Sequence, residues 1–159
     1  MYKAKEIAEK ILWIDKQKKN LFKADDESCF RLMNYLFMLS IRWFAKTKTY
    51  LVKDTFLCHE HGAYLTNIDE IYCKLENNRE NIYIDKETED FIKCFYYYMD
   101  DSTNVETAEI AKSDPAYASV YKTKADEYKE MNTQEFEPYY PILYEHTIIA
   151  MEEEIEDET

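Results

Sequence analysis

The chain has 159 residues, the length of one ordinary domain, and 46% of them are hydrophobic. One glycine and three prolines are too few turn residues for a β-sandwich or a β-barrel, and they exclude the glycine-rich phosphate loops of nucleotide-binding folds. The net charge of −13 opposes direct contact with nucleic acid. We therefore expect a compact, single-domain, all-α helical bundle.

The charge is unevenly distributed along the chain. Residues 1–53 carry 12 Lys/Arg against 6 Asp/Glu, whereas residues 54–159 carry 8 against 27. A basic face near the N-terminus could therefore contact acidic groups, including those of the chain's own second half.

Two helices are predicted in the N-terminal third. Residues 3–14 have apolar residues at helical spacing, with lysine and glutamate between them, which indicates one buried face. Residues 29–44 follow the acidic run Asp25–Glu27 and are apolar on nearly every side. A helix of that kind belongs in the centre of a domain, so we expect residues 29–44 to form the buried core.

The stretch of residues 50–58 lacks a helical pattern and fits either a short strand or an extended arm. Gly62 follows and predicts a sharp turn that needs a permissive backbone. Further helices are expected at residues 67–77, 85–100, 105–112, 115–128 and 141–151. The acidic residues 151–159 are expected to form a frayed tail outside a domain of residues 1–150.

The four cysteines, Cys29, Cys58, Cys73 and Cys94, lie far apart and form no Cys-x-x-Cys pair, so we expect buried free thiols. The N-terminus is charged and lacks the apolar core of a secretion signal. No run approaches the ~18 apolar residues of a membrane span. We expect a cytoplasmic protein.

The cluster that most resembles a metal or catalytic site is His59, Glu60 and His61, next to Cys58. Structural zinc needs four ligands at typical spacings, and a second pair is absent, so we expect a polar turn and neither a metal nor another cofactor. A cysteine nucleophile needs positive neighbours that lower its pKa, and the surroundings here are acidic. We expect no catalytic residues and no enzymatic activity.

Three stretches follow the order and spacing of a known family. They are Arg31–Ser40 (RLMNYLFMLS), Phe56–Gly62 (FLCHEHG) with Ile68–Leu75 (IDEIYCKL), and Ile110–Tyr117 (IAKSDPAY). They resemble the segments "lqKLLYyaq", "feAwkyGPV" with "peVYeel", and "LSelsHsdpaW" of the Panacea domain, once called the phage-associated GepA or SocA-like domain. The resemblance covers about residues 5–125, and Ala63 stands in place of the proline of the family's Gly-Pro-Val.

The resemblance implies an antitoxin that neutralises a partner toxin by direct contact, in some relatives as an adaptor that presents the toxin to a protease. It places the candidate partner-binding surface in the motif region, at His59, His61, Gly62, Tyr64, Asp69 and Tyr72. The alternative, to which we give equal weight, is that these residues only stabilise the turn and the core. The 15 tyrosines agree with a protein interface, since tyrosine is enriched there.

The acidic second half leaves a different function open. A strongly negative surface can imitate nucleic acid, so the chain could be a phage or mobile-element inhibitor of a host enzyme that processes nucleic acid. Both hypotheses predict a protein partner, and neither identifies it.

Overall fold

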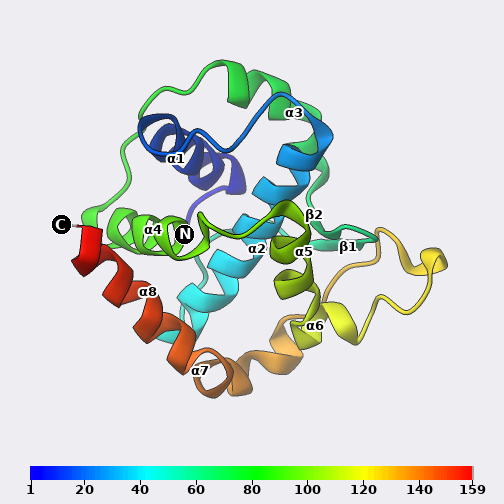
Figure 1. Cartoon of the computed structure of the whole chain (residues 1–159). Helices are drawn as coiled ribbons and strands as arrows, with labels where there is room; N and C mark the ends of the chain where they lie inside the picture. Colours follow the sequence, from blue (N-terminus) through cyan, green and yellow to red (C-terminus); the bar gives the residue numbers. More distant parts are fainter. Residues whose placement is uncertain (159) are drawn as a thin grey trace.

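The computed structural model describes the backbone of residues 1–158 and the side chains of residues 1–154 (Figure 1). The fold is compact and mostly helical with one short hairpin, which confirms the expected class. None of the helices within the described residues is long and apolar enough to cross a bilayer. The helices are α1 (Ala4–Gln17), α2 (Asp26–Thr47), α3 (Thr66–Asn77), α4 (Lys86–Met99), α5 (Asn104–Lys112), α6 (Pro115–Ala118), α7 (Tyr140–Leu143) and α8 (Glu145–Glu158), with 3-10 turns η1 (Lys124–Asp126) and η2 (Gln134–Tyr139) and strands β1 (Leu57–His59) and β2 (Gly62–Tyr64).

Helix α2 crosses the middle of the molecule, between α4 on one side and α5 with the hairpin on the other (Figure 1). The Asp25 side chain caps its start by accepting a hydrogen bond from the Ser28 amide at 2.8 Å. Lys48 ends it in the left-handed conformation at φ 62°. Most of the helix is buried, which confirms the predicted central core helix.

The predicted helix at 115–128 is wrong beyond its first turn. Asp114 caps the start and Pro115 occupies the first position as expected, but α6 ends at Ala118. The amides of Lys122 and Thr123 then donate to the Asp126 carboxylate, at 2.9 and 3.0 Å, instead of to helical carbonyls. A local side-chain acceptor thus replaces the helix in this segment.

The C-terminal helix also differs from the prediction. It is divided into α7 and α8 at Tyr144, whose φ of −113° and ψ of 10° depart from the helical values. Helix α8 packs against α4 and buries Met151, the first residue of the expected tail. The backbone then continues as a helix through Glu158, where the prediction expected a frayed tail. Thr159 lies outside the described residues.

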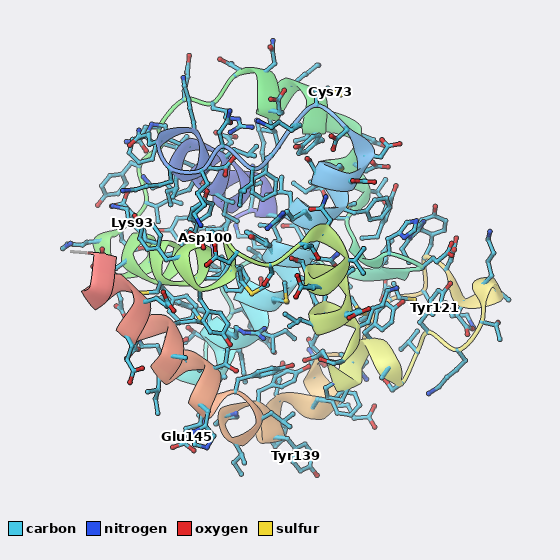
Figure 2. All side chains as sticks on the ribbon, viewed as in Figure 1. Cys73, Lys93, Asp100, Tyr121, Tyr139 and Glu145 are labelled. Atoms are coloured by element: carbon cyan, nitrogen blue, oxygen red, sulfur yellow. The ribbon has the colours of Figure 1, made fainter. Side chains whose placement is uncertain are left out.

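The arm at residues 50–58 is extended, with a parallel bridge between Tyr2 and Val52 before β1 begins. Of the four free thiols, three are buried as expected and Cys73 is exposed on the outer face of α3 (Figure 2). The prediction failed for Cys73 because the core contacts of α3 come from the opposite face of the helix, at Ile68, Tyr72 and Leu75.

Some basic side chains of the N-terminal part pair with acids of the second half. Lys10 Nζ lies 2.6 Å from Glu89, and Lys46 Nζ lies 3.0 Å from Glu152 on α8. Lys19 contacts Asp101 at 2.6 Å. These ion pairs between the basic N-terminal part and the acidic second half therefore connect elements that are distant in sequence.

Candidate functional site

A β-hairpin places the candidate site against the flank of α2. Strands β1 and β2 pair antiparallel, with Cys58 opposite Ala63 and His59 opposite Gly62. Because strand side chains alternate between faces, Cys58 and Ala63 are buried whereas His59 and Tyr64 are half-buried. The hairpin therefore directs two aromatic side chains outward from a fixed base.

The side chain of Asn34, buried on α2, holds the hairpin turn. Its Nδ2 donates to the His61 carbonyl at 3.0 Å, and its Oδ1 accepts from the Ala63 amide at 2.8 Å. Gly62 lies over this amide group with φ +117°, and a Cβ there would stand 2.1 Å from Asn34 Oδ1. Glycine is required for both reasons, the backbone angle and the lack of space.

The segment Tyr128–Met131 lies along the other edge of β1. The Tyr128 amide donates to the Cys58 carbonyl at 2.7 Å, and the Met131 amide donates to the Phe56 carbonyl at 2.9 Å. Tyr128 itself has φ 70°, an unusual value for a residue other than glycine. This turn brings the side chain of a residue distant in sequence to the hairpin.

Five aromatic rings gather at the hairpin. The ring centroids of His59 and Tyr64 lie 5.8 Å apart, and those of Phe30 and His59 lie 4.7 Å apart. Tyr128 packs edge-on against Tyr64 at 5.0 Å, and the His61 ring lies 5.1 Å from Phe30. We call Phe30, His59, His61, Tyr64 and Tyr128 the hairpin aromatic cluster. His61 and Tyr128 are exposed and the other three are half-buried, so the cluster presents an aromatic face to solvent.

Hydrogen bonds fix the polar atoms of this cluster. The Tyr64 hydroxyl donates to Asp69 Oδ2 at 2.7 Å, and the Tyr117 hydroxyl donates to the His59 carbonyl at 2.7 Å. The His61 amide donates to His59 Nδ1 at 3.1 Å, which requires a lone pair there and places the proton of a neutral His59 on Nε2. The rings of Tyr64 and His59 are thus held in place.

Burial lowers the pKa of His59 below its ordinary value of 6.5. The Glu127 carboxylate, with Oε2 4.0 Å from His59 Nε2, opposes this shift only in part, and His61 adds to it. His59 is therefore neutral at pH 7 in the folded protein, in agreement with its role as a hydrogen-bond acceptor.

The lowered pKa of His59 predicts a pH dependence of stability. Between the folded pKa and 6.5 the unfolded chain binds more protons than the folded one, so the free energy of unfolding should fall as the pH falls below 6.5. His59→Gln keeps a hydrogen-bonding side chain and cannot titrate, so we expect it to show a shallower decline. Urea unfolding at several values of pH from 7 to 5 measures this, and a variant with an unchanged slope would contradict it.

The structure divides the predicted site residues into two groups. His59, His61, Tyr64 and Asp69 come together on the surface. Gly62 is buried beneath the turn, and Tyr72 is buried, its hydroxyl donating to the Lys23 carbonyl at 2.6 Å. These two residues shape the turn and the core.

Phe30 and Tyr128 belong to the cluster and were missed. Phe30 was hidden in the apolar pattern of α2, where only its half-burial distinguishes it from core residues. Tyr128 sits in a segment wrongly expected to be helical. Neither residue could be assigned to the site from the sequence, because both reach it by tertiary packing.

The nearby thiols are poor nucleophiles. Burial, together with the Asp69 carboxylate, raises the pKa of Cys29 to about 12, and burial also raises the pKa of Cys58. Both side chains are therefore protonated thiols at neutral pH. Among the residues that the structure describes, no three His, Cys, Asp or Glu side chains are grouped to hold a metal ion.

No protein-family model matches this chain, and neither a curated protein nor a solved structure matches it. The geometry of the hairpin aromatic cluster therefore provides the main basis for a functional proposal, together with the resemblance seen in the sequence.

Proposed function

We propose that this chain is a protein-binding module and that the hairpin aromatic cluster contacts its partner. The observation that carries the proposal is the gathering of Phe30, His59, His61, Tyr64 and Tyr128, which come from three separate parts of the chain, into one partly exposed face. Tyrosines and other aromatic residues dominate the energetics of protein interfaces, since they bury large areas and still offer a polar tip.

The rigidity of the cluster supports this proposal. The rings are packed on one another, and the hairpin beneath them is fixed by Asn34 on one side and by the Tyr128–Met131 segment on the other. A preorganised surface loses less conformational entropy on binding, so more of its contact energy appears as affinity.

The partner we propose is a protein toxin, by the resemblance of three stretches to the Panacea domain. Two of these stretches meet at the site, since Asn34 belongs to the first and His61 and Gly62 belong to the second. The chain would then neutralise its toxin by covering it.

Variants at exposed cluster residues test the binding proposal. His61→Ala with Tyr128→Ala removes two exposed rings and leaves the core intact, so we expect a normally folded protein that binds its partner at least about 30-fold more weakly, which corresponds to about 2 kcal/mol. The partner to examine first is the product of the neighbouring gene, expressed alone and with this chain while growth is scored. Calorimetry with the purified pair then gives the affinity.

Tyr83→Ala is the matched control, because Tyr83 is 90% exposed on the connection between α3 and α4, away from the hairpin. This variant should restore growth as well as the unaltered chain does. If the cluster variant also restores growth and keeps its affinity, the cluster is not the interface. Binding that falls steeply with salt and ignores the cluster would favour the acidic inhibitor instead.

A further inference from the structure

An exposed apolar surface surrounds α7 at the end of the molecule opposite α3 (Figure 1). Ile142 is 77% exposed, Tyr139 61%, Leu143 53% and Ile149 48%. Single exposed apolar residues are ordinary, but a group of large ones within eleven positions marks an interaction site. We call Tyr139, Ile142, Leu143 and Ile149 the C-terminal apolar surface.

Backbone hydrogen bonds join the two helices that carry most of these side chains. The Tyr144 amide donates to the Tyr140 carbonyl at 3.0 Å, and the Ile148 amide donates to the Tyr144 carbonyl at 2.9 Å, so helical bonding continues across the break between α7 and α8. Ile149 on α8 therefore follows Ile142 and Leu143 on α7 without an intervening loop.

This surface is held firmly to the body of the protein. The Tyr144 hydroxyl donates to Asp114 Oδ2 at 2.5 Å, and the Tyr140 hydroxyl donates to Asp114 Oδ1 at 3.2 Å. The buried Arg42 guanidinium packs over the Tyr144 ring at 4.5 Å. The exposed apolar residues therefore belong to a docked segment and not to a loose end.

The segments that carry this surface have acidic side chains and no lysine or arginine. Glu135, Glu145 and Glu153 are exposed on the same segments, and no lysine or arginine follows Lys129 in the sequence. Figure 2 shows Tyr139 and Glu145 on the outer edge of the molecule, directed away from its body. Glu152 contacts Lys46 at 3.0 Å, and the other acids near the surface form no ion pair among the side chains described.

This negative rim selects the kind of occupant. A second copy of the chain would bring an identical acidic rim against the first, and anionic lipid or nucleic acid would be repelled in the same way. A segment with apolar side chains flanked by lysine or arginine would satisfy both the apolar centre and the rim.

We propose that the C-terminal apolar surface binds a basic amphipathic helix of a partner protein. Ile142, Leu143 and Ile149 would receive its apolar face, and Glu135, Glu145 and Glu153 would pair with its cations. The surface is separate from the hairpin aromatic cluster (Figure 1), so this second interface does not rest on the function proposed above.

A defined peptide tests the proposal. The probe is a fluorescein-labelled 18-residue peptide of leucine and lysine with the leucines on one helical face, and its binding to the full chain is followed by fluorescence anisotropy at physiological ionic strength. We expect saturable binding, with a scrambled peptide of the same composition binding at least about tenfold more weakly because it lacks a continuous apolar face. A glutamate-for-lysine version should not bind.

Two protein variants locate the binding. Ile142→Asn should weaken peptide binding at least about tenfold, because it places an amide in the apolar centre of the contact. Val105→Asn is its control, since Val105 is 68% exposed on α5, and it should have no effect. Equal affinities for the two variants, or equal affinities for the ordered and scrambled peptides, would overturn the proposal. Sedimentation that shows a dimer dissociated by Ile142→Asn would overturn it in favour of a second copy.

Discussion

Replacing Asp15 with alanine is expected to lower the free energy of unfolding by about 3–5 kcal/mol, a large share of the roughly 5–15 kcal/mol of a typical domain. Asp15 is fully buried at the end of α1. Its Oδ1 accepts from the Tyr96 hydroxyl at 2.6 Å and from the Leu21 amide at 2.8 Å. Its Oδ2 accepts from Arg79 Nη1 at 2.9 Å and from the Phe22 amide at 3.0 Å.

The size of this effect follows from the buried groups that would lose their partner when the Asp15 carboxylate is removed. The Arg79 side chain is 6% exposed, so its charge would stay buried without the carboxylate. Its Nε and Nη2 still donate to the carbonyls of Glu76 and Phe22. Nη2 also keeps the Glu76 carboxylate at 3.4 Å, but this acid is farther away than Asp15 and 22% exposed, so it replaces the buried partner only in part. The Tyr96 hydroxyl would also lose its acceptor, which adds a desolvation cost.

Urea unfolding measures the loss of free energy of unfolding, and two further variants show how much of it comes from the buried charge. Asp15→Asn keeps the volume and removes the charge, so it should fall between the wild type and Asp15→Ala. Asp101→Ala removes a carboxylate whose side chain is 89% exposed beside Lys19, and we expect little change because solvent screens that pair. Similar losses for Asp15→Ala and Asp101→Ala would show that the buried network does not stabilise the fold.

Gly62→Ala is expected to lower the free energy of unfolding by about 3 kcal/mol, because it combines backbone strain with the loss of one buried and one partly buried hydrogen bond. A φ of +117° is unfavourable for any residue with a Cβ, and that Cβ would stand 2.1 Å from Asn34 Oδ1. To make room, Asn34 must release the His61 carbonyl and the Ala63 amide. The hairpin would loosen, and the aromatic cluster above it would lose its fixed arrangement.

The comparison with Asn34→Ala separates the two contributions. That variant removes both hydrogen bonds without straining the backbone, so it should cost less than Gly62→Ala. The double variant should lose less free energy of unfolding than the two single variants together, since the Asn34 side chain that the new Cβ would clash with is gone. Glu60→Ala, exposed in the same turn, controls for changes in the loop itself. If Gly62→Ala unfolds at the same urea concentration as Glu60→Ala, the backbone at this position is not strained.

Local sequence patterns predicted most of the helices. The spacing of apolar residues identified α1 and α4, and the uninterrupted apolarity of residues 29–44 identified the central helix. The single glycine predicted the sharp turn at Gly62. These features depend on the intrinsic shape of the backbone and on burial of one face, which neighbouring residues encode by themselves.

The composition of the site was decided by tertiary contacts. Residues 119–128 leave the helical path because the Asp126 carboxylate takes their amides and because the following segment pairs with β1, and this brings Tyr128 beside Tyr64. For Tyr72 the sequence left a partner-facing and a structural role equally open, and the packing of α3 buries it. The sequence determined by itself that the chain is helical, acidic and rich in tyrosine. Which tyrosines face solvent depended on contacts between segments up to about a hundred residues apart, which no local pattern encodes.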